Sequence, residues 1–185
     1  MNKRSVLAVA AALTFGFSAL YASEQKDPMV GGAAMYPTKN IVENAVNSKD
    51  HTTLVAAVKA AGLVDTLESP GPFTVFAPTN EAFDKLPAGT VDTLLKPENL
   101  AQLKKILTYH VVAGKLTAKD IAKQIKAGGG KATLTTVEGG TLTAMMQGGK
   151  LVLTDEKGGT ATVTIANVIQ SNGVIHVIDT VLMPN

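Results

Sequence analysis

The chain contains no cysteine and no tryptophan, and only 4% of its 185 residues are aromatic. The absence of cysteine excludes disulfide bonds, thiol nucleophiles, thiolate metal sites and thiol redox chemistry. With so few aromatic side chains, the interior must be built from valine, isoleucine, leucine and alanine. A chain of this length can still bury enough surface for one core without covalent cross-links.

Arginine is almost absent, because Arg4 is the only one in the sequence. The formal net charge is +2, from 17 basic and 15 acidic residues, and Lys3 and Arg4 alone supply this excess. Arginine is the usual residue for bidentate contacts to phosphate and guanine and for neutralising a transferring phosphoryl group. We therefore expect neither nucleic-acid binding nor phosphoryl transfer, although lysine can still contact phosphate as a point charge.

Motifs of common catalytic sites are also missing. There is no Gly-x-Ser-x-Gly elbow and no glycine-rich loop followed by lysine and Ser/Thr. The three histidines are scattered, without the spacing of metal ligands. Met29, Met35, Met145 and Met146 could ligate a soft metal, but we place the last two in the core and the first two in an N-terminal arm. We predict a protein that is not an enzyme and has no metal or cofactor.

The N-terminus has the pattern of a secretory signal peptide. Lys3 and Arg4 precede an apolar run from Val6 to Leu20, and the small residue Ala22 follows. We predict a signal peptide over residues 1–22. The alternative is a retained membrane anchor, but a membrane span needs about 20 apolar residues and this run is short. Because no second apolar run follows, we predict a periplasmic or secreted protein with no transmembrane span after cleavage.

Residues 23–38 show neither a helical nor a strand period. They contain Pro28, Gly31-Gly32 and Pro37, so we predict an extended arm. From Lys39 onward the pattern becomes regular, and we predict one domain over residues 39–184.

The first half of this domain predicts helices, because apolar residues recur at helical spacing. One helix begins near Leu54, where Thr52 or Asp50 could cap its start. Thr117 and Asp120 form a capping box before a lysine-rich helix. Other helical stretches are expected from Ile41, after Thr79 or Asn80, and from Pro97.

The last third changes to a strand period. Four runs rich in β-branched residues are separated by glycine-bearing turns, which supply the positive φ that tight hairpins need. Further short strands are predicted at Phe73–Phe76, at His110–Val112 and at Gly173–Ile178. Since helices come early and antiparallel strands late, the fold class is α+β. The four runs are Leu134–Val137, Leu142–Met145, Leu151–Leu153 and Thr162–Ile165.

Two segments and one dipeptide carry a family resemblance. The segments are FTVFAPTNEAF at Phe73–Phe83 and NGVIHVIDTVLMP at Asn172–Pro184, and Tyr109-His110 lies between them. In this order they resemble the signature of fasciclin-like domains, and the chain is similar to the bacterial exported proteins of that family from about Lys39 to Pro184. The resemblance implies a wedge or sandwich of short β-strands surrounded by small helices.

The resemblance also implies a function. It is that of an exported, non-enzymatic module for adhesion, or for interaction with an extracellular matrix or cell surface. The partner would be a protein or polysaccharide at that surface, and self-association is left open. The alternative is a periplasmic carrier or sensor that binds a small apolar or lipid ligand.

Tyr109 and His110 are candidate binding residues. In animal fasciclin-like proteins a Tyr-His motif with branched apolar flanks is linked to integrin recognition. The alternative is structural, because histidine and tyrosine at a helix end often hydrogen-bond the nearby backbone. A second family motif has an Asp-Ile pair where this chain has Asn167 and Val168, and the missing carboxylate argues against integrin. The flank of the first motif here is Ile106, Leu107, Val111 and Val112.

The other motif residues are interpreted as mainly structural. Strand alternation places His176 and Asp179 on opposite faces, so they form no catalytic pair, and His176 is expected in the core. His51 is expected at the surface near a helix start. The motif residues are Thr74, Phe76, Pro78, Thr79, Phe83, Asn172, Gly173, His176 and Asp179.

Lys119, Lys123 and Lys126 are spaced by four and three residues, so they share one helix face. Lys115 precedes them and Lys131 follows. Such a face is most often simply solvated. The functional hypothesis is a patch that binds an anionic surface, either polysaccharide or lipid headgroups.

Overall fold

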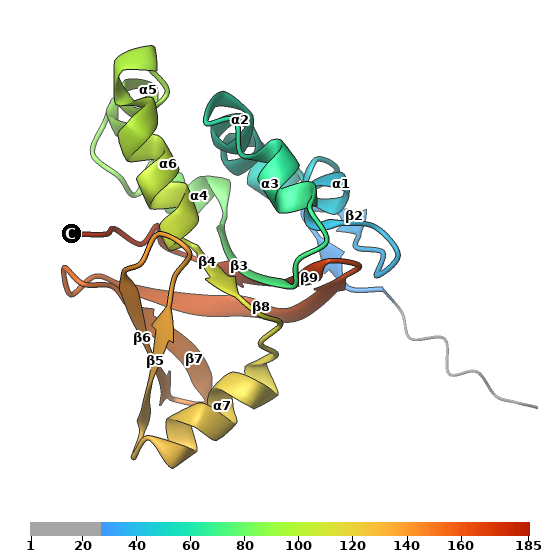
Figure 1. Cartoon of the computed structure of the whole chain (residues 1–185), viewed down its shortest axis with the longest axis vertical. Coiled ribbons are helices and arrows are strands. Elements are labelled where there is room, and N and C mark those ends of the chain that lie inside the picture. Colours follow the sequence, from blue (N-terminus) through green and yellow to red (C-terminus); the bar gives the residue numbers. More distant parts are fainter. Residues whose placement is uncertain (1–26) are drawn as a thin grey trace, which may run out of the picture.

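The two signature segments lie side by side, although about ninety residues separate them in the chain. The computed structural model describes residues 27–185, so the predicted signal peptide and the start of the predicted arm lie outside the described residues. Figure 1 shows most helices gathered on one side of a curved sheet and one lysine-rich helix on the other side. This arrangement confirms the predicted α+β class.

Helices predominate in the first part of the described chain, and five consecutive strands form its last part. The helices are α1 (Ile41–Ala45), η1 (Lys49–His51), α2 (Thr52–Ala60), α3 (Val64–Glu68), α4 (Asn80–Asp84), α5 (Thr90–Leu94), η2 (Pro97–Asn99), α6 (Leu100–Tyr109) and α7 (Ala118–Ala127). The strands are β1 (Met29–Val30), β2 (Ala33–Ala34), β3 (Phe73–Pro78), β4 (Val111–Ala113), β5 (Lys131–Thr135), β6 (Thr141–Gln147), β7 (Lys150–Thr154), β8 (Thr160–Gln170) and β9 (Gly173–Ile178). Among these helices, none is long and apolar enough to cross a membrane.

The main sheet has the strand order β4-β3-β9-β8-β7-β6-β5 in residues 27–185. Strands β5 to β9 follow one another as antiparallel neighbours, as the glycine turns predict, whereas β3 and β9 pair in parallel. A bridge between Val112 and Thr136 joins the two ends of this order, so the sheet curls into a nearly closed barrel. The parallel β3–β9 pair sets the two signature segments in register, from Phe73 opposite Gly173 to Pro78 opposite Ile178.

Strand β8 forms the corner of this barrel. Its first residues pair with β7 and its later residues pair with β9, and two irregularities in register lie between Val163 and Val168. A bulge of this kind bends a strand and increases its twist. Asn167 lies in the bulge with a φ of 61°, which non-glycine residues rarely adopt.

The core lies on both faces of β3 and β9. Val75 and Ala77 face a cluster beneath helices α1 to α6, while Phe76 faces a second cluster with α7 and strands β5 to β8. Both clusters consist mainly of aliphatic side chains, as the composition predicts. The alternating side chains of β3 therefore join two apolar layers into one molecule.

Local signals place most helix starts correctly. Thr117 and Asp120 form the predicted capping box of α7, and the Thr79 side chain caps α4. The predicted cap of α2 by Thr52 or Asp50 is wrong, because Asn80 Oδ1 accepts the Thr53 N–H at 3.1 Å instead. The cap comes from another helix, at a distance along the chain that local patterns do not reach.

The predicted extended arm differs from the structure in its described part. Strands β1 and β2 form a hairpin around Gly31-Gly32, both of which have positive φ. Val30 and Met35 are buried, and the Lys49 N–H donates to the Gly31 carbonyl at 3.1 Å. The hairpin is stabilised because Val30 and Met35 bury their apolar side chains beside η1. The glycine- and proline-rich pattern of this segment does not reveal that packing.

Candidate functional site

The Tyr109-His110 pair lies inside the molecule at the end of α6. His110 is 3% exposed, its Nδ1 donates to the Ile106 carbonyl at 2.8 Å, and its Nε2 accepts the Leu182 N–H at 3.0 Å. Burial lowers the pKa of His110 to about 4, although the Ile106 carbonyl opposes this shift. The ring is therefore neutral near pH 7, and both of its nitrogen atoms are hydrogen-bonded to backbone groups.

Tyr109 is fully buried beside it. Its hydroxyl donates to the Thr141 carbonyl at 2.7 Å and accepts the Glu156 N–H at 3.2 Å. Burial raises the pKa of Tyr109 to about 12, so the phenol stays protonated. These contacts join α6 to the β6 and β7 region and leave almost no surface of the pair for a partner. The predicted binding role of Tyr109 and His110 stays a prediction, and a direct contact would require this region to open.

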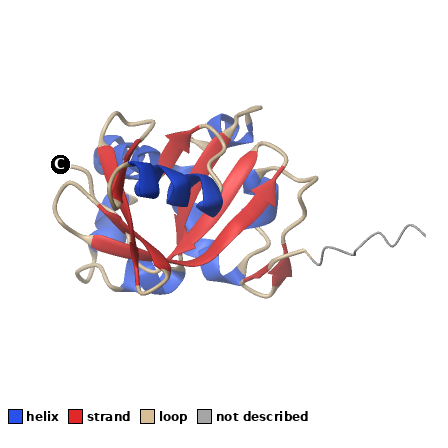
Figure 2. Cartoon of the chain, turned by 90° about the horizontal axis from the view of Figure 1, so that it is seen from below, coloured by secondary structure: helices blue, strands red, loops and turns tan. Residues whose placement is uncertain are grey.

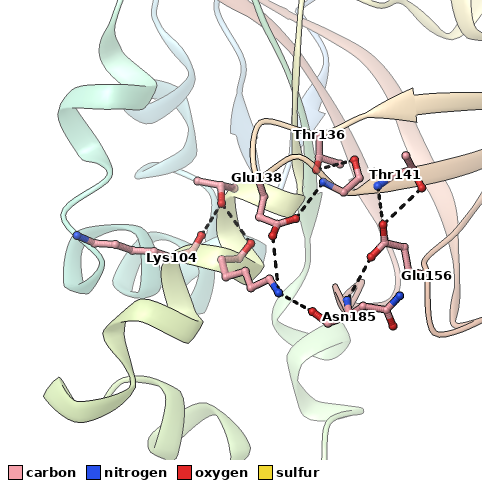
Figure 3. Close-up of polar contacts among 9 residues, drawn as sticks. Lys104, Thr136, Glu138, Thr141, Glu156 and Asn185 are labelled. Atoms are coloured by element: carbon pink, nitrogen blue, oxygen red, sulfur yellow. Dashed lines mark hydrogen bonds and ion pairs between the residues drawn. The ribbon is translucent and has the colours of Figure 1, made fainter.

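The C-terminal tail, residues 182–185, is held over the same region by hydrogen bonds. The Met183 N–H donates to Asp155 Oδ2 at 2.9 Å, next to the contact between Leu182 and His110. Farther out, the Asn185 N–H donates to Glu156 at 3.3 Å, and Lys105 Nζ donates to the Asn185 carbonyl at 2.5 Å (Figure 3). Backbone N–H groups of Thr141 and Asn185 lower the pKa of Glu156. His110 thus holds the C-terminal tail through its contact with the Leu182 N–H.

His176 is completely buried on β9, as expected of a core histidine. Its Nε2 donates to the Leu116 carbonyl at 2.8 Å, its Nδ1 accepts the Asn167 N–H at 3.3 Å, and its ring stacks on Phe76. Asp179 accepts the Thr162 N–H at 2.8 Å instead of contacting the histidine. The two residues hold separate parts of the fold, which agrees with the predicted absence of a His/Asp pair.

The remaining motif residues form contacts that hold segments together. Asn172 accepts the Ile41 N–H and donates to two carbonyls of the α3 region, and Thr74 bonds both Gly114 and Leu116. At Gly173 a Cβ atom would collide with the Phe73 carbonyl across the parallel pair. Thr79 caps α4, and Pro78 and Phe83 are buried beside it.

The lysines of α7 lie where the sequence places them. Ile121 and Ile125 are buried against the sheet, and Lys119, Lys123 and Lys126 are exposed on the opposite side of the helix. Figure 2, which views the molecule from below, has this helix in front of the sheet with its outer side free of other elements. We call these three residues the lysine face.

An apolar cleft lies on the other side of the sheet, between α2 and α3 and the end of α6. It holds about 1000 Å³ of space, including the part that is open to solvent. Its floor is formed by β3 and β9. Residues that define this cleft are Leu54, Val58, Leu67, Val75, Leu107 and Ile175.

His51 lines the apolar cleft, so its predicted surface position is wrong. It is 4% exposed, and its Nδ1 lies 2.9 Å from Ser48 Oγ. Within residues 27–185, no group reaches its Nε2 at hydrogen-bonding distance and angle. Burial lowers the pKa of His51, and the Ala77 carbonyl opposes this only in part. A sequence signal existed, because His51, Leu54 and Val58 follow the helical spacing of a buried stripe.

Possible metal ligands are dispersed in the described part of the chain, where no group of three or more histidine, aspartate or glutamate side chains converges. The methionines also differ from expectation. Met146 is exposed and Met145 only half-buried, because β6 extends beyond the core, whereas Met35 is buried and Met29 exposed.

Comparison with known families and curated proteins gives consistent matches. A family model described as the Fasciclin domain matches residues 49–184. Protein sll1483 of Synechocystis is 50% identical over 161 residues, which cover 86% of this chain and 82% of that protein. Immunogenic protein MPB70 of Mycobacterium bovis is 41% identical over 76% of this chain and 66% of its own length. Cell surface glycolipoprotein MPB83 of the same species is 35% identical over 86% of this chain and 61% of its own length.

A comparison with solved structures finds the same fold. A structure titled as a FAS1 domain pair from the insect cell adhesion molecule Fasciclin I matches with a TM-score of 0.69 and 22% identity. The match covers 78% of this chain and 51% of that one, so this chain spans about half of the insect structure. At this identity the likeness shows the fold alone.

Proposed function

This chain belongs to the fasciclin domain family, and from that premise we propose that it is an exported, non-enzymatic adhesion module. Family membership is the observation that carries the proposal. Related proteins are named as a cell surface glycolipoprotein and as an immunogenic protein, and the insect structure comes from a cell adhesion molecule. Removal of the predicted signal peptide would place the domain in the periplasm or outside the cell.

The lysine face is the contact surface of this proposal. The side chains of Tyr109, His110 and His176 are buried, so these motif residues support the fold. Contact with a partner would then be made by exposed residues. Lys119, Lys123 and Lys126 project together from α7, with Asp120 the nearby acid at 3.9 Å from Lys123. Because the chain without residues 1–22 is neutral overall, the patch is a local feature rather than an effect of net charge. A polyanion, such as an acidic polysaccharide of an envelope or matrix, complements it.

Binding to an immobilised acidic polysaccharide tests the proposal. We expect the chain without residues 1–22 to bind alginate but not neutral dextran, with an affinity that falls as salt increases. The triple substitution Lys119→Glu, Lys123→Glu and Lys126→Glu should abolish this binding, which surface plasmon resonance would measure.

A charge-matched variant supplies the control. Lys49, Lys96 and Lys157 are exposed outside α7, and their joint change to glutamate produces the same net charge. This control should keep most of the binding. Equal losses in the two triple variants would refute a localised patch, and absence of saturable binding to polysaccharide, matrix protein and cells would refute the adhesive function.

The apolar cleft favours a second candidate function, a carrier or sensor for a small apolar molecule. Ligand sites are usually concave and mostly apolar, with a few polar groups that orient the ligand. The cleft has this composition, since its walls are aliphatic and His51 is among its few polar residues. Native mass spectrometry of gently purified protein should then detect a bound molecule, and a mass equal to that of the chain alone would count against this function.

A further inference from the structure

We propose that the apolar cleft binds a slender, uncharged alcohol whose hydroxyl group hydrogen-bonds to His51 Nε2. This inference rests on the second candidate function and specifies the chemistry of its ligand. The hydrocarbon part would lie along the aliphatic walls, and the hydroxyl would reach the inner end of the cleft.

The interior of the cleft is apolar, and its entrance is open to solvent. Leu54, Val58 and Ile175 are buried in its walls. Val137, which is 47% exposed, lies at the solvent side, where Lys59 and Thr66 also line the edge. A ligand can therefore enter from the solvent side and bury a hydrocarbon chain as it moves inward.

His51 is the polar point of this interior. A buried nitrogen without a partner costs free energy, which a suitable ligand group recovers on binding. His110 also lines the cleft, but both of its nitrogen atoms already contact backbone groups. Among the described residues, the hydrogen bond of the His51 ring is that of Nδ1 with Ser48. The Ala77 carbonyl lies near the ring but does not meet hydrogen-bonding geometry at Nε2, so Nε2 is the atom that remains for a ligand.

A hydroxyl group fits this nitrogen in either tautomer. The Ser48 hydroxyl can donate to Nδ1 or accept from it, and Nε2 is correspondingly a donor or an acceptor. A ligand hydroxyl can accept in the first case and donate in the second. A carbonyl or an ether can only accept, so it would bind only one tautomer of His51. An alcohol can bind both tautomers.

The charge and size that the cleft accepts restrict the class of ligand further. Since burial keeps the His51 ring neutral, a carboxylate or ammonium group at this depth would lose its hydration without an opposite charge. The cavity volume of the cleft, taken as the space open to the centre of a water molecule, is about 70 Å³. An engineered cavity that binds benzene measures about 150 Å³, so a narrow chain fits this one better than a ring.

The two ends of the cleft distinguish the proposal from a fatty-acid site. A fatty acid would place its carboxylate at the mouth, near Lys59, and its methyl end at His51. That orientation would leave Nε2 without a partner and would use the lysine instead. Hexanoate and Lys59→Gln are therefore the appropriate comparisons for 1-hexanol and His51→Phe.

A titration of the ¹⁵N-labelled chain without residues 1–22, followed by NMR, tests the proposal. We expect 1-hexanol to shift the amide signals of Val58, Val75 and Ile175 while leaving those of Ile121 and Ile125 on α7 unchanged. The imidazole Nε2 signal of His51 should shift as well. Binding of 1-hexanol should be about tenfold tighter than that of 1-chlorohexane, a ratio equivalent to about 1.4 kcal/mol.

Two variants separate the possible outcomes. His51→Phe should remove the preference for the alcohol, and Lys59→Gln should leave it unchanged. If His51→Phe does not fold, the comparison of the two ligands on the wild-type protein still decides. Equal affinity for 1-hexanol and 1-chlorohexane would overturn the role of His51 but retain the second candidate function.

Tighter binding of hexanoate, lost in Lys59→Gln, would overturn the proposed orientation in favour of a fatty-acid site. If none of the three probes shifts the cleft signals, both this inference and the second candidate function are refuted, while adhesion through the lysine face is untouched.

Discussion

Single buried polar residues hold distant segments of this protein together. Asn172 is the clearest case, because one side chain bonds the Ile41 N–H at 3.0 Å, the Leu67 carbonyl at 2.7 Å and the Ser69 carbonyl at 2.9 Å. It thereby joins the turn before β9 to the start of α1 and the end of α3. This role explains why an asparagine opens the second signature segment.

Replacement of Asn172 by alanine should therefore destabilise the fold strongly. The change leaves three backbone groups without their partner, and we expect a loss of about 2–4 kcal/mol in the free energy of unfolding. Urea denaturation followed by circular dichroism would measure it. Asn99→Ala is the matched control, because Asn99 makes an exposed contact to the Thr93 carbonyl and should cost less than about 1 kcal/mol. Equal losses in both variants would contradict the proposed role of Asn172.

At the scale of elements, the β8 bulge positions α7 and its lysine face. Asn167 has a φ of 61° and its Oδ1 accepts the Ala118 N–H at 2.7 Å, so one residue both shapes the bulge and caps the helix. The family motif has an aspartate where this chain has Asn167. An asparagine can perform this structural task as well as an aspartate, because both tolerate a left-handed backbone and accept at a helix start.

Three substitutions at Asn167 separate its two tasks. Asn167→Asp should leave stability near that of the wild type, Asn167→Gly should lose the cap and cost about 1 kcal/mol, and Asn167→Ala should add backbone strain and cost about 2–3 kcal/mol. Denaturation curves would give the order, and hydrogen exchange at Ala118 would report the cap directly. If glycine and alanine have equal effects, the bulge backbone is not strained.

Elements that depend on neighbouring residues were predictable, and those that depend on distant contacts were not. The capping box of Thr117 and Asp120 and the glycine-turned hairpins follow from a few adjacent residues. The Asn80 cap on α2 and the burial of His51 depend on packing between segments. The same holds for the candidate site, because the lysine face follows helical spacing whereas the apolar cleft requires five or more elements to meet.

At the scale of the whole molecule, the three histidines make the free energy of unfolding depend on pH. Each is buried, and burial lowers the pKa of His51, His110 and His176. A histidine with a lowered folded pKa binds protons more readily after unfolding, so acid favours the unfolded chain. Stability is therefore complete above the unfolded pKa of 6.5 and declines as pH falls toward the folded value, about 4 for His110.

We expect His110 alone to account for a loss of about 2 kcal/mol between pH 7 and pH 4.5, with His51 and His176 adding to it. Carboxylates with lowered pKa, such as Glu156, contribute in the same direction but mainly below their ordinary pKa of 4.5. Urea denaturation at half-unit pH steps would measure the slope, and His110→Gln should reduce it while lowering stability at every pH. NMR titration of the His110 ring supplies the decisive observation: a ring that gains its proton near pH 6.5 would show that the histidine is solvated, and that the Leu182 contact does not hold the C-terminal tail.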